Sequence, residues 1–467
     1  MSERLEDWRA VRRYAVPGWM IAECAEARER EDWRAACEAA RVDVRVGDPG
    51  PVAGLLAGFA PDLLRWHLPR ALNGTAALAQ RMRFLLTPDG PVTADTVVLQ
   101  VRSPRWVSGA QRLTLLSGRL GDLGPGPVFP VAPHLWDARR AAELTAGTPT
   151  WASTGWQVPA AVPAPGEDLL GPADPVVAAR ELRRVTAQFR RWSWRLWPEG
   201  IRSAYRRPDR HVRLEIGDGR LRVVLRADEP SQPAPTRADL CLHRQLLRSP
   251  VDLDLVRLGH LDAGEVHPLV RAALFPGAGG SGAGGSLVPD GFGDEEMLRI
   301  HCAGQWHRIR LRGGRLELLH HTVAEKEREL ALGAFGGVIN ACFRVDRAWR
   351  RGEGALPKRL RAYRRDLWRR MEHGGGRVVL ALLDAGLDPG FRDGQGRTLL
   401  HRIHQFEHAE LLPRLLAEGL DVNDRGRYGH PPMFETLIHT PSHDLLRALT
   451  EAGAWPPLSL PVPSIGP

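Results

Sequence analysis

Lysine is almost absent from this chain of 467 residues: only Lys326 and Lys358 occur, so the net charge of +9 is carried by arginine. A bias of this kind, with abundant alanine, glycine and proline, is typical of a GC-rich genome whatever the function of the protein. The basic charge therefore says less about binding partners than it would in a lysine-rich protein.

Long apolar runs are missing as well. No run reaches the ~18–20 residues that a membrane-spanning helix needs, and the longest candidates, 51–60 and 331–343, contain Gly, Asn or Cys. The first seven residues are acidic rather than the basic start of a secretory signal. We therefore expect a cytoplasmic protein without a membrane anchor.

Cysteine is scarce, and its spacing fits no disulfide framework. The number is odd, no CxxC motif occurs, and a chain of this length can bury a core without covalent staples. We expect reduced, buried thiols at all five positions, which are Cys24, Cys37, Cys241, Cys302 and Cys342.

Motifs for catalysis and for cofactors are missing too. The run 277–282 matches GxGxxG by letter, but no strand precedes it and no helix start follows, so it reads as a surface linker. No Walker A sequence, GxSxG elbow or HExxH motif is present. We assign no catalytic residue and expect no cofactor, although an enzyme with an unfamiliar N-terminal active site remains open.

Histidines cluster between residues 301 and 321, close to Cys302, and imidazole and thiolate groups are zinc ligands. Successive residues of a strand point to opposite faces, so His301 and Cys302 cannot both reach one metal without a bulge, nor can His320 and His321. The sequence therefore predicts no metal site at these residues or at His307.

The remaining pattern predicts an α+β fold, because helices and antiparallel hairpins occur without regular βαβ alternation. Alternating apolar residues predict hairpins at 211–225 and 306–320, and we leave open whether they share a sheet. Single strands are expected at 97–101 and 112–116, and helices over much of 1–50 and at 134–144, 175–196 and 323–343.

Changes in composition divide the chain into six segments. They are a helical start at 1–50, a mixed α/β region at 51–165 that ends in a Pro/Ala/Gly-rich linker, a basic helix plus hairpin at 166–275, a Gly/Ser-rich linker at 276–293, a hairpin plus helix at 294–357, and a repeat region at 358–457.

The repeat region is similar to itself at a period of about 33 residues. Gly386, Gly419 and Gly453 occupy the same place in successive periods. The segments Leu382–Pro389 and Leu415–Asn423 are two copies of one unit ending, each with paired leucines before the glycine. The layout predicts two short helices per unit, followed by a glycine cap and an extended tip.

This period and these motifs resemble the ankyrin repeat, although the first unit matches mainly in its second half. The resemblance implies an all-α solenoid of about three units that binds a protein of unknown identity. An alternative is that so short an array docks on the N-terminal body as a cap. The tips and concave face would comprise Phe391, Arg392, Asp393, Gln395, Arg402, Gln405, Phe406, Asp424, Arg425, Arg427 and Tyr428.

Two arginine-rich segments, 180–213 and 344–370, suggest a less favoured function in nucleic-acid binding. Arginines with interleaved aromatics can track phosphates and stack on bases. The residues concerned are Arg190, Arg191, Trp192, Trp194, Arg195, Arg364 and Arg365. Helical spacing offers a plainer reading, in which Leu360, Tyr363 and Leu367 form a core face and the arginines are solvated.

Overall fold

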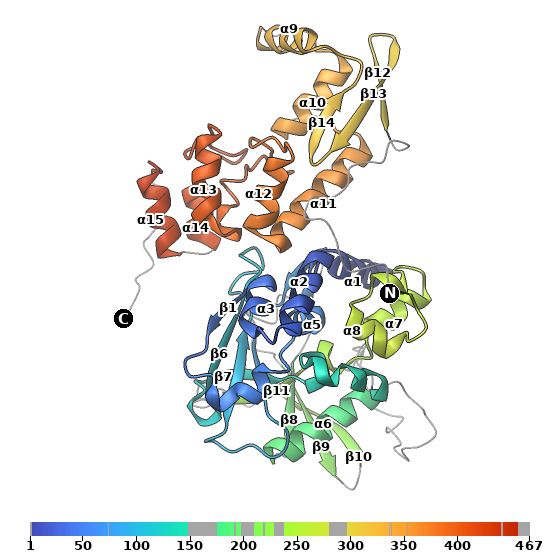
Figure 1. Ribbon diagram of the computed structural model, residues 1–467, viewed down its shortest axis with the longest axis vertical. Coiled ribbons are helices and arrows are strands. Elements are labelled where there is room, and N and C mark those ends of the chain that lie inside the picture. The colour runs from blue at the N-terminus through green and yellow to red at the C-terminus, as the bar shows by residue number, and fades with distance from the viewer. Residues whose placement is uncertain are drawn as a thin grey trace. The chain divides into compact units, whose positions relative to one another are not determined.

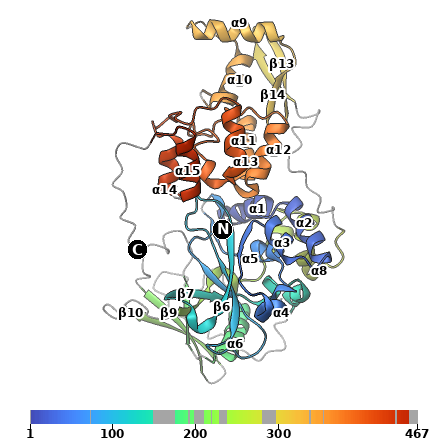
Figure 2. The same ribbon diagram turned by 60° about the vertical axis from the view of Figure 1, so that its left-hand side comes forward.

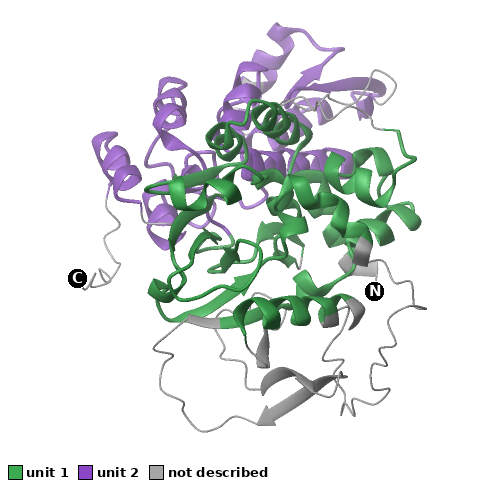
Figure 3. Ribbon diagram, turned by 60° about the horizontal axis from the view of Figure 1, so that its bottom comes forward, with its two compact units in different colours: residues 1–107, 111–285 green, residues 108–110, 286–467 purple. Residues whose placement is uncertain are grey.

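A computed structural model of the protein describes residues 2–72, 74–147, 175–190, 193–197, 210–217, 220–227, 238–279, 297–335, 337, 339–352, 354–439 and 442–455. The chain forms two compact units (Figure 3). Unit 1 comprises residues 1–107 and 111–285, and unit 2 comprises residues 108–110 and 286–467. The long boundary, after residue 285, lies within the glycine-rich segment 276–293, most of which is outside the described residues.

Unit 1 begins with the expected helices, α1 (Ser2–Tyr14), α2 (Gly18–Glu29) and α3 (Trp33–Ala39). The Asp32 side chain caps α3 by accepting a hydrogen bond from the backbone N–H of Ala35. Residues 1–50 also contain a strand that the sequence did not predict, β1 (Val42–Arg45), which pairs in parallel with β6. Its valines suit a pleated strand better than a helix.

A mixed sheet of nine strands, counted over the described residues, runs through unit 1 in the order β1-β6-β5-β4-β7-β11-β8-β9-β10. Strands β4, β5 and β6 pair antiparallel, whereas β7 joins β4 and β11 in parallel. Their bounds are β4 Arg83–Leu86, β5 Val97–Arg102, β6 Leu113–Arg119, β7 Gly126–Pro130, β8 Ser193–Trp197, β9 Arg210–Gly217, β10 Arg220–Ala227 and β11 Ala238–His243. The strands predicted at 97–101 and 112–116 are thus confirmed.

Shorter elements complete unit 1, and α2, α3 and α5 pack together beside β1 (Figures 1 and 2). The helix expected at 134–144 is wrong in type, since this stretch forms 3-10 segments at Pro133–Leu135 and Ala138–Gly147. The other elements are α4 Ala53–Leu56, α5 Pro61–His67, β2 Arg70–Leu72, β3 Thr75–Leu78, α7 Val251–Arg257 and α8 Pro268–Leu274, with 3-10 turns at Gly50–Val52, Leu120–Asp122, Arg244–Leu247 and Ala263–Glu265.

The predicted hairpin at 211–225 is confirmed as β9 and β10, although its turn residues 218–219 lie outside the described residues. The basic helix is shorter than predicted. It forms α6 (Pro175–Phe189) and ends before Arg190, whose φ of 51° is left-handed. The chain then enters β8, which pairs with β9 and β11, so sheet hydrogen bonds replace the last helical turns.

Unit 2 begins with a three-stranded antiparallel sheet of its own, so the two predicted hairpins do not share a sheet. Its strands are β12 (Leu298–Cys302), β13 (Gln305–Arg312) and β14 (Arg315–Leu318), and the predicted Gly313-Gly314 turn has positive φ at both residues. Ile309, Leu311 and Leu316 are buried on one face.

The single helix predicted at 323–343 is wrong, because the chain forms two helices there. Helix α9 (Val323–Ala334) begins with a capping box at Thr322, and α10 (Ala341–Arg351) packs against β12 and β14. The intervening stretch contains glycines, which are poor helix formers. No helix of the described residues is both long and apolar enough to cross a membrane.

The repeat region consists of short packed helices. They are α11 (Lys358–Gly374), α12 (Gly376–Asp384), α13 (His408–Ala417), α14 (Pro432–His439) and α15 (His443–Glu451). Gly386, Gly419 and Gly453 end α12, α13 and α15 with φ of 98°, 85° and 87°, as the repeat predicts. The first helix of the middle unit is only a 3-10 turn, Ile403–Gln405, so the region departs from a regular solenoid of helix pairs.

Candidate functional site

The loop at 391–397 of the ankyrin-like region is organised around one buried carboxylate. Asp393 accepts hydrogen bonds from the backbone N–H groups of Gln395 and Arg397 and from the guanidinium groups of Arg397 and Arg402. Burial alone would raise the pKa of Asp393, but the two arginines and the backbone donors lower it below its usual value. Asp393 is therefore a structural residue, not the exposed contact expected from the sequence.

Three further residues expected on the binding surface are core residues. Phe391 is completely buried, with its ring stacked on Trp368 at 5.6 Å between centroids and tilted against Trp349 at 5.2 Å. Phe406 and Gln405 are also buried, and the Gln405 amide donates to the backbone carbonyl of Ser108 within unit 2. Burial of an aromatic ring in this core is more favourable than its exposure to water, so Phe391 and Phe406 turn inward.

Ion pairs hold three other predicted surface residues. Arg392 binds Asp424 of the next loop, and Arg402 binds Asp393 at 2.9 Å. All three loop residues Arg392, Arg402 and Asp424 are half-buried. The pair of Arg392 and Asp424 connects neighbouring units, and the pair of Arg402 and Asp393 lies within one unit, so these charges are already paired within the protein.

The remaining predicted contacts are exposed. Gln395 lies at the tip of the first loop, and Arg425, Arg427 and Tyr428 lie on the second, where 66% of Tyr428 is accessible. These three second-loop side chains make no hydrogen bond or ion pair with any residue the structure describes.

The second loop is held in place from beneath by His401. Its Nδ1 accepts a hydrogen bond from the backbone N–H of Thr398, and its Nε2 lies 3.1 Å from both the backbone carbonyl oxygen of His430 and the backbone nitrogen of Gly426. Burial lowers the pKa of His401, which favours the neutral ring that this arrangement requires. The backbone N–H of Gly429 closes a turn onto the carbonyl of Gly426.

A second buried histidine lies three residues further along the chain. Both ring nitrogens of His404 lack a hydrogen-bond partner among the described residues, and the ring stacks on His439 at 5.2 Å. Burial, with the nearby His439, lowers the pKa of His404 to about 3. In the pH range where the unfolded chain takes up a proton at this histidine, the folded protein therefore keeps the ring neutral.

Acid is therefore expected to destabilise the protein through His404. As pH falls from 7 to 5, the unfolded chain binds a proton at a pKa of about 6.5 and the folded chain does not, which costs about 2 kcal/mol. The His404→Phe variant should lose less stability over this interval than the unmodified protein. Urea unfolding at both pH values measures this difference, with His443→Phe, at an exposed position, as the control. Equal pH dependence in all three proteins would contradict the prediction.

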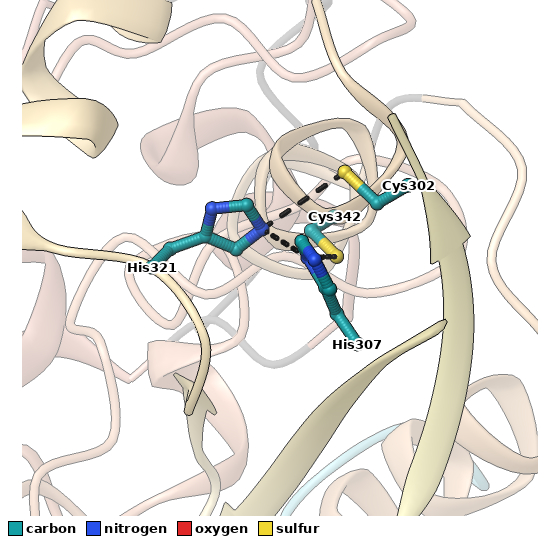
Figure 4. Close-up of side chains that lie close together, drawn as sticks. All are labelled: Cys302, His307, His321 and Cys342. Atoms are coloured by element: carbon teal, nitrogen blue, oxygen red, sulfur yellow. Dashed lines mark hydrogen bonds between the residues drawn. The ribbon is translucent and has the colours of Figure 1, made fainter. Parts of the chain in front are cut away.

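Four potential metal ligands come together elsewhere in unit 2 (Figure 4). Cys302 ends β12, His307 lies on β13, His321 follows β14, and Cys342 is in the first turn of α10. One ligand atom from each lies within 4.8 Å of all the others. The closest contacts are His307 Nδ1 to His321 Nε2 at 2.8 Å, Cys342 Sγ to His307 Nδ1 at 3.7 Å and Cys302 Sγ to His321 Nε2 at 3.9 Å.

The surroundings of this cluster favour uncharged groups when nothing is bound. Both sulfur atoms belong to buried residues, and burial together with a hydrogen bond to Cys302 raises the pKa of Cys342 to about 12. Burial and the neighbouring His307 lower the pKa of His321. A metal ion would displace the protons of the two thiols and bind the two imidazoles through the lone pairs of their neutral rings.

The sequence prediction missed this cluster because Cys342 lies well beyond His321 in the chain and on a helix. The alternation argument itself is correct, since only one member of each neighbouring pair is used. His301 turns to Trp306, with ring centroids 5.2 Å apart, and His320 stacks on His307 at 5.5 Å. The missed signal is the antiparallel register, which places Cys302 opposite Gln305 and hence on the same face as His307.

Among the residues that the structure describes, those suggested for nucleic-acid binding do not form a single surface. Arg190 and Arg365 are exposed, whereas Arg364 is half-buried and donates to the backbone carbonyl of Ala348. Trp194 and Arg195 lie on β8, not on a helix, and their side chains, like residues Arg191 and Trp192, are outside the described part. Leu360 and Leu367 are fully buried, as the plainer reading predicted.

One cavity in unit 1 bears on the possibility of an unfamiliar N-terminal active site. It has a volume of about 50 Å³ and is lined in part by Trp8, Arg12, His67 and His134. Burial lowers the pKa of His134 to about 4. Ligand pockets usually enclose about 300–1,000 Å³, so this cavity has room for water rather than for a substrate.

Comparison with known proteins supports an ankyrin-like segment. The chain is 33% identical over 81 residues to a protein of Schizosaccharomyces pombe described as an ankyrin repeat-containing protein. The match covers 17% of this chain and 39% of that protein, so it extends to well under half of either. No protein-family model and no solved structure matches the chain.

Proposed function

We propose that this protein is a non-enzymatic interaction protein that binds a protein partner through the second loop of its ankyrin-like segment, residues 424–430. The observation that carries the proposal is an exposed tyrosine that follows two exposed arginines on a loop whose backbone is held by His401. The relative in Schizosaccharomyces pombe supports the ankyrin-like character of the segment but names no partner.

The composition of this loop suits recognition of another protein. Tyrosine and arginine are enriched among the residues that contribute most to binding energy, because each combines a large apolar surface with a polar group. Tyr428, Arg425 and Arg427 present that combination within one short stretch. Two guanidinium groups beside an aromatic ring fit a partner surface that carries carboxylates around an apolar pocket.

The fixed backbone of the loop adds to the argument. A loop that is already ordered loses less conformational entropy when it binds than a loose one does. Here the contacts of the His401 ring with the backbone of Gly426 and His430, together with the turn at Gly426–Gly429, hold the chain on both sides of Tyr428. This arrangement favours recruitment of a partner over the alternative, in which the repeats only cap the rest of the chain.

The double variant Arg425→Ala/Tyr428→Ala is expected to lose its partner and keep its fold. Both side chains are exposed, so the melting temperature should stay within about 4 °C of that of the unmodified protein. The measurement is affinity capture of the full chain from nuclease-treated lysate of the source organism. The control, Arg447→Ala, removes an exposed arginine from α15, away from the loop.

Each result has a definite meaning for the proposal. A protein captured by the unmodified chain and by Arg447→Ala, but not by the double variant, supports recognition through this loop. Capture of the same proteins by all three chains would place recognition elsewhere. A large fall in melting temperature of the double variant would instead favour a structural role of the loop as part of a cap.

A further inference from the structure

We propose that Cys302, His307, His321 and Cys342 form a structural zinc site that joins the three-stranded sheet of unit 2 to helix α10. The four side chains come from β12, β13, the segment after β14 and the start of α10, and they point toward one centre (Figure 4). The inference is independent of the proposed partner-binding loop, which lies in the repeat region.

The spacing of the ligand atoms fits a tetrahedral ion. Zinc bonds of about 2.0–2.1 Å to nitrogen and about 2.3 Å to sulfur place the ligand atoms of a tetrahedron about 3.3–3.8 Å apart. The two sulfur–nitrogen distances of 3.7 and 3.9 Å agree with this geometry. The two nitrogens, 2.8 Å apart, have to separate by only about 0.5 Å to reach it.

The fold selects these four groups from a richer set of histidines. The antiparallel pairing of Cys302 with Gln305 puts His307, two positions further on, on the same face of the sheet. His321 lies shortly beyond β14 and turns back toward this face, and Cys342 reaches it from α10. The excluded neighbours His301 and His320 are exposed.

The donor set indicates both the metal and its role. Two thiolates and two imidazoles are ligands that zinc prefers, and the two negative sulfur atoms balance the charge of a divalent ion in a buried position. Four protein ligands leave no position open for a substrate, so the site is structural rather than catalytic. The carboxylate of Glu325 lies 3.7 Å from Nδ1 of His321, where it can orient the ring for binding through Nε2.

A structural ion would stabilise the part of unit 2 around the site. Small modules, such as a three-stranded sheet with one packed helix, are often stabilised by a structural ion. Without an ion, the four polar side chains of the cluster contact one another between β12, β13 and α10. Zinc would bind all four and link the strands to the helix through one centre.

The first test uses the unmodified full-length protein, so it does not depend on how a variant folds. The protein is expressed in zinc-supplemented medium, and weakly bound metal is removed by dialysis. It should then contain about one zinc ion per chain when measured by inductively coupled plasma mass spectrometry. Removal of zinc with a strong chelator should make two more cysteine thiols react with a thiol reagent. It should also lower the melting temperature, and added zinc should restore it.

The second test identifies the ligands. His321→Asn and Cys302→Ser should each lose most of the bound zinc, whereas the matched neighbours His320→Asn and His301→Asn should retain it. Refilling the metal-free protein with Co²⁺ should give the strong visible bands of tetrahedral cobalt and a thiolate charge-transfer band. Both sets of bands should weaken in Cys302→Ser and persist in His320→Asn.

Three results would overturn the proposal. The first is a protein that contains no zinc and binds neither zinc nor cobalt when titrated. The second is an intact mass lower by two hydrogen atoms, with Cys302 and Cys342 in one disulfide-linked peptide. The third is equal loss of metal from His320→Asn and His321→Asn, which would place the ion outside this cluster.

Discussion

Replacing Asp62 with alanine is expected to lower the free energy of unfolding by about 3–5 kcal/mol, because the substitution leaves the Arg28 guanidinium and the His267 ring without the buried carboxylate that they bind. Asp62 is fully buried on α5 and accepts hydrogen bonds from Arg28 of α2 at 2.5 Å and from His267 at 3.0 Å. The substitution thus breaks one network that connects three separate parts of unit 1.

The pKa of Asp62 gives the same prediction a pH dependence. Burial alone would raise this pKa, but the hydrogen bonds and charges of His267 and Arg28 lower it below its usual value. A carboxyl group with a lowered folded-state pKa contributes stability above its unfolded pKa and loses it as pH falls. The gap in stability between Asp62→Ala and the unmodified protein should therefore narrow in acid.

A matched control distinguishes the stability contribution of a buried carboxylate from that of an ion pair in general. Asp43 and Arg112 form an ion pair at 2.6 Å whose side chains are 43% and 29% exposed. Asp43→Ala should cost only about 0–1 kcal/mol, because solvent screens the pair. Urea unfolding followed by circular dichroism measures both variants, and hydrogen exchange of the α5 peptide locates the change. Similar costs for the two variants would contradict the assignment of Asp62 to the core.

The second large effect is expected at Phe391 in unit 2. Phe391→Ala should destabilise the protein by about 3–5 kcal/mol, because it removes a fully buried ring and leaves a cavity between Trp349 and Trp368. The expected signs are a lower midpoint of urea unfolding and faster hydrogen exchange in α10 and α11. Tryptophan fluorescence should also change, since both neighbours of the ring are indoles.

Tyr428→Ala is the matched control, since it also truncates an aromatic residue of a repeat loop. Its side chain is exposed, so its cost should stay within about 0.5 kcal/mol. The pair of variants thus distinguishes an aromatic residue that supports the fold from one available for binding. A stable Phe391→Ala protein that has lost its partner would reverse these two assignments.

The sequence by itself determined the features that depend on local spacing. The repeat period placed the glycines that end α12, α13 and α15, because only a residue without a side chain takes this positive φ at little cost. Alternation of apolar residues likewise located β9, β10, β13 and β14, since side chains of a strand alternate between its faces. The ankyrin-like segment was recognised on the same local grounds.

Tertiary structure alone decided which residues of those elements are buried and which meet. Phe391 and Tyr428 are both loop aromatics in the sequence, and only packing against Trp349 and Trp368 assigns Phe391 to the core. The helical pattern continues past Arg190, yet pairing of β8 with β9 and β11 ends it. Cys302 and Cys342 lie far apart in the sequence, and only the packing of α10 on the sheet brings their sulfur atoms to one centre. Such contacts depend on the free energy of the whole core, which no local window of sequence contains.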